Sequence, residues 1–135
     1  MTWKKIFKNA YVPYSGNPSA CVVEAESGKK YVGVRVENIS YPITIPAVQA
    51  ACSICLSEGE KPIRIFVPKP SMEQLIFWTE EFDLEVIESE LPENFEPENL
   101  YHLKDGEFSA PDYLQALLNS AVTPNFDFPV SALLY

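Results

Sequence analysis

The sequence lacks several features that would place it in a functional class directly. Its 135 residues include only 3 cysteines, an odd number, which argues against a disulfide framework, and only 1 histidine. No apolar run reaches the length of a membrane span, no signal peptide opens the chain, and no glycine-rich phosphate-binding motif occurs. We therefore expect a cytoplasmic protein without a P-loop.

Positive charge is also scarce. The 10 Lys and Arg residues are outnumbered by 19 Asp and Glu residues, which gives a net charge of −9. A general nucleic-acid binder needs a basic surface, and an anionic membrane attracts one. We therefore expect neither nucleic acid nor a membrane as a partner.

What is present is an ordinary globular balance, with 47% hydrophobic and 21% charged residues. This length suits one domain, residues 1–135, with a sizeable core. Apolar periodicity predicts helices over residues 2–10, 45–57 and 71–82, and strands over 20–25, 31–36, 63–67 and 84–87. Helices that alternate with strands predict an α/β sandwich with at least one parallel pair of strands.

The centre of this pattern is residues 33–51. The strand that ends at Val36 leads through a polar loop to Pro46, which suits the first turn of a helix. In the helix over residues 71–82, we expect Met72, Leu75, Ile76 and Phe82 to be buried.

Three short motifs in the chain resemble those of the small homo-oligomeric cytidine deaminases. They are AYVPYS at residues 10–15, ENISYP at 37–42 and LPENFEPENL at 91–100. The resemblance implies a three-layer α/β/α sandwich with a mixed central sheet over residues 1–100. Residues 101–135 would form a C-terminal extension with one helix. Only eight residues separate Phe82 from Leu91, where the family fits two strands, so the fifth strand is predicted to be missing or supplied elsewhere.

The departures from the family pattern concern its chemistry. In that family a Cys-Ala-Glu triplet supplies a zinc ligand and the general acid/base, and a Pro-Cys-x-x-Cys motif supplies two more ligands. By position, these four functional residues correspond to Pro46, Val48, Met72 and Leu75. None of these side chains suits zinc or proton transfer. The resemblance therefore predicts no zinc, no other cofactor and no catalytic residue at these positions.

An alternative uses the other potential ligands of the chain. Cys52 and Cys55 form a C-x-x-C pair, and Cys21 and His102 complete the set. A displaced site of this kind would make the protein a nucleoside or nucleotide deaminase or hydrolase. However, the pair falls in the second and third turns of a buried helix, where cysteine is typically a small hydrophobic side chain.

The candidate ligand pocket comprises Asn17, Arg35, Glu37, Asn38 and Tyr41. The family binds a ribose hydroxyl through Asn-x-Glu, which here is Arg35 and Glu37, and stacks the base on a Phe, which here is Asn17. Arg35 and Glu37 share a strand face and can satisfy each other. Alternatively, Arg35 binds a phosphate or carboxylate, so that the ligand is small and anionic or nucleotide-like.

The acidic residues between positions 80 and 90 are a further candidate for acid/base work, but their spacing favours a solvated face. Taken together, the sequence predicts a catalytically inactive relative of cytidine deaminase that acts as a binding or assembly protein. Tyr41-Pro42 and Phe95 are retained and residues 126–135 are apolar, so we also predict a homo-oligomer, either a dimer or a tetramer.

Overall fold

The computed structural model describes residues 1–69, 75–92 and 94–98, together with residues 114, 115, 118, 119, 121, 122 and 132. Its helices are α1 (Trp3–Phe7), α2 (Ala47–Ser57) and α3 (Ile76–Phe82), with a short 3₁₀ helix η1 (Tyr41–Ile43). Its strands are β1 (Ala20–Ala25), β2 (Lys30–Val34), β3 (Pro62–Val67) and β4 (Glu85–Glu88). No helix among these residues is long and apolar enough to cross a membrane.

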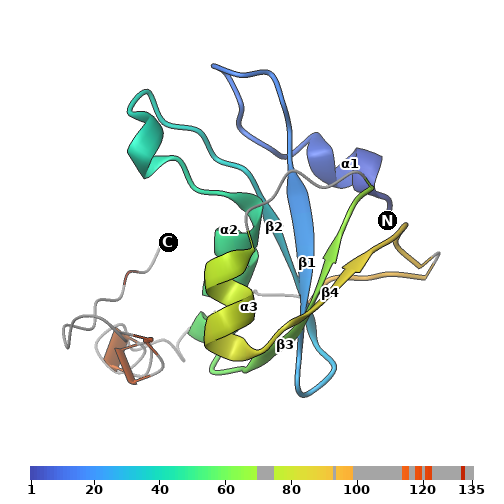
Figure 1. Ribbon diagram of the computed structural model, residues 1–135, viewed down its shortest axis with the longest axis vertical. Coiled ribbons are helices and arrows are strands. Elements are labelled where there is room, and N and C mark those ends of the chain that lie inside the picture. The colour runs from blue at the N-terminus through green and yellow to red at the C-terminus, as the bar shows by residue number, and fades with distance from the viewer. Residues whose placement is uncertain are drawn as a thin grey trace, which may run out of the picture.

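The four strands form one mixed sheet in the order β2-β1-β3-β4 (Figure 1). Strand β1 is antiparallel to both β2 and β3, and β3 is parallel to β4. Helix α3 makes the crossover between the parallel strands, which confirms the predicted parallel pair. The described part of the chain thus contains four of the five strands that the resemblance implies.

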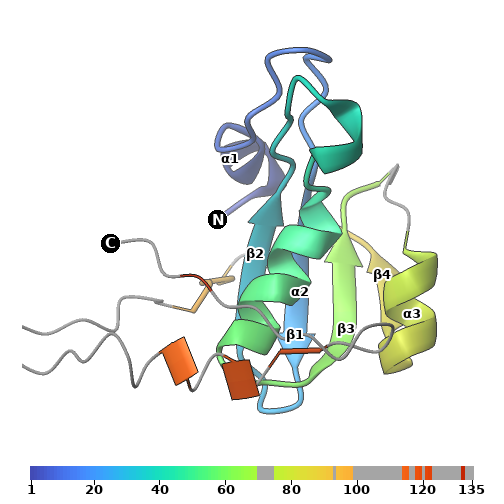
Figure 2. The same ribbon diagram turned by 90° about the vertical axis from the view of Figure 1, so that its left-hand side faces the viewer.

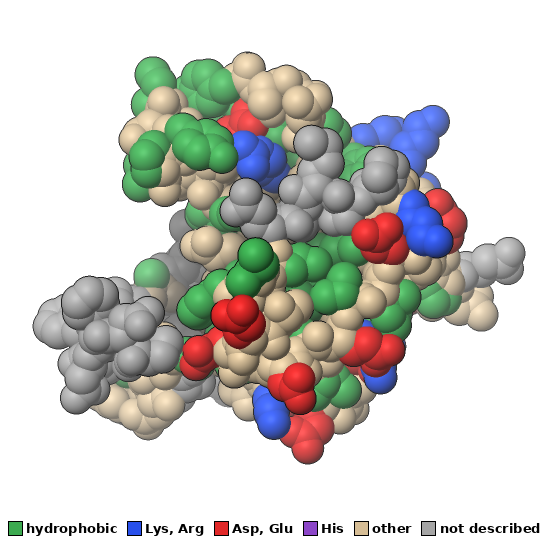
Figure 3. All heavy atoms as spheres, in the orientation of Figure 1, with side chains coloured by type: hydrophobic (Ala, Val, Ile, Leu, Met, Phe, Trp, Pro, Cys, Tyr) green, Lys and Arg blue, Asp and Glu red, His purple; other side chains and the backbone are tan. Residues whose placement is uncertain are grey.

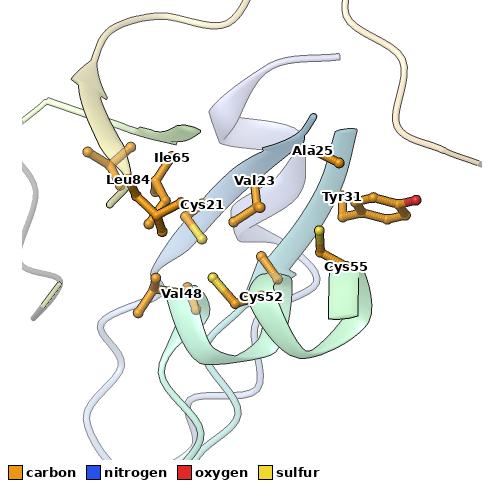
Figure 4. Packing of buried hydrophobic residues seen from close by; sticks show 12 residues of the cluster. Cys21, Val23, Ala25, Tyr31, Val48, Cys52, Cys55, Ile65 and Leu84 are labelled. Atoms are coloured by element: carbon orange, nitrogen blue, oxygen red, sulfur yellow. The ribbon is translucent and has the colours of Figure 1, made fainter. Parts of the chain in front are cut away.

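Helices α2 and α3 cover one face of the sheet and α1 lies on the other, which confirms the three-layer α/β/α architecture (Figure 2). Strand β1 is central, and its side chains alternate between the two faces because successive residues of a strand point in opposite directions. Cys21, Val23 and Ala25 join the core under α2 and α3 (Figure 4). Ala20 and Val22 join the core under α1.

The segment after β4 crosses the α1 face of the sheet. Near the start of this segment, Trp3 Nε1 donates a hydrogen bond of 2.8 Å to the Ser89 carbonyl. Phe95 is buried with Trp3 and Ile6 in the second core cluster. Glu98 N then donates to the Lys30 carbonyl of β2 at 2.9 Å. The described residues of the LPENFEPENL motif therefore return the chain from β4 to the opposite edge of the sheet.

Two expectations about the helices need correction. Pro46 lies at the N-cap of α2, in extended conformation, because the preceding Ile45 is paired with Val36 as a β-bridge. Ile76 is 72% exposed rather than buried. The residues of α3 that pack on the core are Trp78 and Phe82, after Leu75 at its N-cap, because these three share one side of the helix.

Some expectations fall on parts of the chain that can be assessed only in part or not at all. Met72 and the rest of residues 70–74 lie outside the described residues, as does His102. In the C-terminal extension, Leu114, Gln115, Leu118 and Asn119 are helical. The remainder of the predicted helix there lies outside the described positions.

Candidate functional site

The candidate site lies just beyond the end of β2, where residues 35–37 are held between two other segments. On one side Tyr11 N donates to the Arg35 carbonyl at 3.0 Å, and Glu37 N donates to the Tyr11 carbonyl at 2.8 Å. On the other side Val36 and Ile45 exchange backbone hydrogen bonds of 2.9 and 2.8 Å. These bonds fix the bases of two loops, which project together beyond the sheet and α2 (Figure 2).

The Glu37 carboxylate is the centre of this arrangement and is only 6% exposed. Its Oε1 accepts from the backbone N–H groups of Tyr14, at 3.1 Å, and Ser15, at 3.0 Å. Its Oε2 accepts from Ser15 Oγ at 2.5 Å and from Arg35 Nε at 3.0 Å. A carboxylate has about four acceptor positions, so the chain's own four donors occupy them.

These contacts lower the pKa of Glu37 to about 2. The largest cause is the hydrogen bond from the Ser15 hydroxyl, and burial opposes it by disfavouring the charged form. The Ser15 backbone N–H, the Arg35 guanidinium and the Tyr14 backbone N–H lower the pKa further. Glu37 is therefore ionised throughout the physiological pH range and is not poised for proton transfer.

The other predicted pocket residues are placed differently around Glu37. Asn17 is exposed and its backbone N–H donates to Ser15 Oγ at 3.1 Å. Asn38 Oδ1 accepts from Ser40 N at 2.9 Å, which forms a turn in the next loop. Tyr41 lies in η1 and is 77% exposed.

The structure therefore brings Arg35 and Glu37 into contact, with Asn17 connected to them through Ser15. The hydrogen bonds of Asn38, in contrast, stay within its own loop, to Ser40 and Thr44. Ser15 was not predicted to belong to the site, although it ends the AYVPYS motif. The signal was available there, since Ser and the two N–H groups around it are natural donors to a carboxylate.

In the family that the motifs resemble, a zinc ligand and the general acid/base occupy the position that corresponds here to the start of α2. Ala47 is fully buried and Val48 is 1% exposed, and both belong to the core cluster against which Leu75 packs (Figure 4). Within residues 1–69, 75–92 and 94–98, no three His, Cys, Asp or Glu side chains are grouped so that they could hold a metal ion. The residues present at this position do not fit a zinc ion, because proline, valine and leucine offer no ligand atom.

Cys52 and Cys55 project from α2 into the same core and are fully buried. Burial is the largest cause that raises the pKa of each thiol to about 12. Cys55 Sγ also lies 3.8 Å from the Glu60 carbonyl, as a donor. Because the thiolate is the form that binds metals and attacks electrophiles, these thiols are inert at neutral pH.

The two projecting loops expose a group of large apolar side chains, which we call the apolar arm. It consists of Tyr11, Tyr14, Val36, Ile39, Tyr41, Ile43 and Ile45. Figure 3 shows apolar side chains gathered on this projecting part of the molecule. Exposed apolar surface on this scale is typical of an interaction site.

Comparisons with known proteins agree with this fold. The crystal structure of cytidine deaminase from Mycobacterium leprae matches with a TM-score of 0.53 and 21% identity, over 62% of this chain and 79% of that one. The crystal structure of cytidine deaminase from Mycobacterium tuberculosis matches with a TM-score of 0.50 and 23% identity, over 61% of this chain and 73% of that one. The protein has the cytidine-deaminase-like fold.

The sequence of the N-terminal half makes the relationship more specific. Residues 4–67 match the family described as the cytidine and deoxycytidylate deaminase zinc-binding region. A cytidine deaminase from Mycoplasma genitalium is 34% identical over 58 residues, which cover 43% of this chain and 44% of that protein. One from Sporosarcina psychrophila is 36% identical over 61 residues, 45% of each. The chain thus matches less than half the length of these relatives, and this half supports a relationship to the cytidine deaminase family.

Proposed function

We propose that this protein is a cytidine deaminase-like protein that does not deaminate cytidine and acts as a binding or assembly protein. The proposal rests on the start of α2, where Pro46 forms the N-cap and the side chain of Val48 is buried in the core. A deaminase of this fold needs a thiolate and a carboxylate at these two positions. Here the space is filled by apolar side chains, which stabilise the core instead of supporting chemistry.

A second candidate is a deaminase or hydrolase with a displaced site. It is favoured by the names of the relatives, which are cytidine deaminases, and by the retained Glu37, Asn38 and Tyr41. The C-x-x-C pair would have to supply its ligands. The raised pKa of both thiols and their burial count against this candidate.

Elemental analysis and a cytidine-to-uridine turnover assay on the purified protein distinguish the two candidates. The proposal predicts far less than one zinc per chain and no turnover above the rate without protein. About one zinc per chain, with turnover that is abolished in Cys52→Ser or Cys55→Ser, would instead establish the displaced site. Both variants need circular dichroism to show that they remain folded.

We further propose that any residual ligand of the Glu37 site is a small anion or nucleotide-like molecule. The carboxylate of Glu37 already accepts four hydrogen bonds, so it has little capacity left for a sugar hydroxyl. Arg35 donates only its Nε to Glu37, whereas a guanidinium has five N–H groups. A thermal-shift screen should favour nucleotides or small acids. Stabilisation that is greatest with cytidine or uridine would contradict the argument.

The assembly that we propose is a cytoplasmic homo-oligomer, a dimer or a tetramer, in which the apolar arm contributes to the interface. Seven large apolar side chains gathered on two loops support this proposal, because burying them releases water from apolar surface.

A further inference from the structure

The outer edge of β4 is a second surface with binding potential, on the opposite edge of the sheet from β2 and the Glu37 site. Strand β4 pairs with β3 on one side and is the last strand of the sheet among the residues that the structure describes. The described residues that follow β4 do not pair with this edge, since Glu98 already lies at Lys30 on β2, where its N–H donates to the Lys30 carbonyl. An edge strand presents backbone donors and acceptors that another strand can use.

The register shows which backbone groups face outward. Ser89 N donates to the Val67 carbonyl at 3.1 Å, so the backbone groups of Ser89 point toward β3. Because backbone groups alternate in direction along a strand, those of Glu85 and Ile87 also point toward β3. The N–H and C=O groups of Val86 and Glu88 therefore point to the open edge. The side chain of Val86 is 41% exposed as well.

The surroundings of this edge carry charge of one sign. Six exposed acids lie on or beside β4: Glu80, Glu81, Asp83, Glu85, Glu88 and Glu90. Residues 75–92 contain no Lys or Arg. Arg64 pairs with Glu85 across β3 and β4. Its guanidinium forms ion pairs with two carboxylates, through Nε with Glu85 at 2.9 Å and through Nη1 with Glu24 at 2.7 Å. The open edge is therefore acidic, and it attracts positively charged partners.

A second copy of β4 does not suit this edge. A second copy would bring its own β4, and the six acids on or beside it, next to those of the first copy, with no Lys or Arg in residues 75–92 of either to balance them. Charges of one sign held this close repel each other. The charge pattern thus disfavours self-pairing while it favours a strand of opposite charge.

We propose that the edge of β4 binds an extended segment of another protein that carries Lys or Arg residues, by addition of a strand to the sheet. Main-chain hydrogen bonds to Val86 and Glu88 would supply affinity, and the acids around β4 would supply the preference for basic side chains. Glu85 and Glu88 lie on opposite faces of the sheet, so the basic side chains of an added strand meet an acid on whichever face they occupy. This role is independent of whether the protein deaminates cytidine.

The test uses a fluorescent peptide that alternates lysine and valine, and the full-length chain. Anisotropy should show binding that weakens when NaCl is raised from about 50 to about 500 mM, because salt screens exposed charges. Amide hydrogen exchange should slow at Val86 and Glu88 when the peptide is added. A peptide of the same composition, interrupted by proline, should bind at least about tenfold more weakly, since it cannot complete the hydrogen bonds.

Two variants separate strand addition from general attraction. Glu88→Lys should weaken binding by about tenfold, whereas Glu26→Lys, the same charge change in an exposed turn outside β4, should leave it within about twofold. Val86→Pro removes an outward N–H without removing a bond to β3, and should also weaken binding by about tenfold. Circular dichroism would show that each variant is folded.

Three outcomes would overturn the proposal. Equal binding of the proline-interrupted peptide would show that only charge attracts the peptide. No binding at low salt would show that the acids merely protect the edge from pairing. Slow exchange at Val86 and Glu88 in the free protein, lost when residues 99–135 are deleted, would show that the chain's own C-terminal part covers the edge.

Discussion

Glu37 gives the clearest physical argument at the scale of single residues. Its four donors come from Tyr14, Ser15 and Arg35, two of which lie 22 and 23 positions earlier in the chain. The ionised carboxylate therefore joins the loop of residues 11–18 to the end of β2. We interpret it as a structural connection between these segments, in place of a sugar-binding carboxylate.

This interpretation predicts a pH dependence of stability. The pKa of Glu37 is about 2 in the folded protein and 4.5 without its contacts, so folding favours the ionised form. The stabilisation from this residue is complete above pH 4.5 and is lost as the pH falls through that value toward 2. Glu37→Gln should therefore be less stable than the native protein at pH 7, and the difference should shrink toward pH 2.

Urea unfolding monitored by fluorescence at several pH values measures this difference. Glu26→Gln is the matched control, because Glu26 is an exposed carboxylate in a turn, and it should follow the native protein at every pH. A difference between Glu37→Gln and the native protein that stays constant from neutral to acidic pH would contradict the assignment.

Val48 provides a second test with a single residue. Val48→Glu would place a carboxylate at a position that is 1% exposed and surrounded by apolar side chains. We expect a loss of unfolding free energy of about 2–5 kcal/mol, or protonation of the new acid, because a buried charge without a partner is costly. The exposed neighbour Gln49 gives the control Gln49→Glu, which should change stability by less than about 0.5 kcal/mol.

Chemical denaturation of both variants measures these changes. A Val48→Glu variant that is as stable as the native protein and takes up zinc would show that a functional cavity persists at the start of α2. That result would also count against the proposed loss of catalysis.

At the scale of secondary-structure elements, the contact between α2 and β2 positions the start of α2. It depends on Gly33, where an added Cβ would lie 2.3 Å from the Ala47 carbonyl oxygen and 2.4 Å from Ala51 N. Both atoms belong to the backbone of α2, so a side chain at position 33 forces the helix away from the sheet. Small residues on α2, such as Ala47 and Ala51, complete the close approach.

Gly33→Ala should therefore destabilise the protein by about 1–3 kcal/mol, because overpacking must be relieved by moving a whole helix. Gly59→Ala is a useful comparison, since its Cβ would meet nothing within 4 Å and only its φ of +73° is unfavourable. That change should cost about 1 kcal/mol. Thermal or chemical denaturation compares the two. An equal or smaller loss for Gly33→Ala would show that α2 can shift without cost.

At the scale of the whole molecule, the apolar arm determines what we expect for assembly. Light scattering at micromolar concentration should show a dimer or a tetramer. The double variant Ile39→Asp and Ile43→Asp, in which two of the seven apolar side chains of the arm become charged, should shift the protein toward the monomer. Ile76→Asp, a change at an exposed residue of α3, should leave the oligomer intact. A native protein that is monomeric would contradict this prediction.

Much of the fold could be predicted because its signals are local. The alternation in residues 20–25 and 31–36, the proline and glycine breaks, and the helical spacing after Pro46 all act within a few residues of the chain. The same is true of the contact between Arg35 and Glu37, since residues two apart on a strand share a face. The identities of Pro46 and Val48 also follow from the sequence alone, as does the chemistry that they cannot perform.

Other features were decided only by the tertiary structure, because they depend on segments that are distant in the chain. The donors of Ser15 and Tyr14 reach Glu37 only when Tyr11 pairs beside Val36. The exposure of Ile76 depends on which side of α3 meets the core. The open edge of β4 depends on the path of residues 94–98, which lead across the sheet to β2. Periodicity specifies that a helix has an apolar side, but contacts with the rest of the molecule select which residues that side contains.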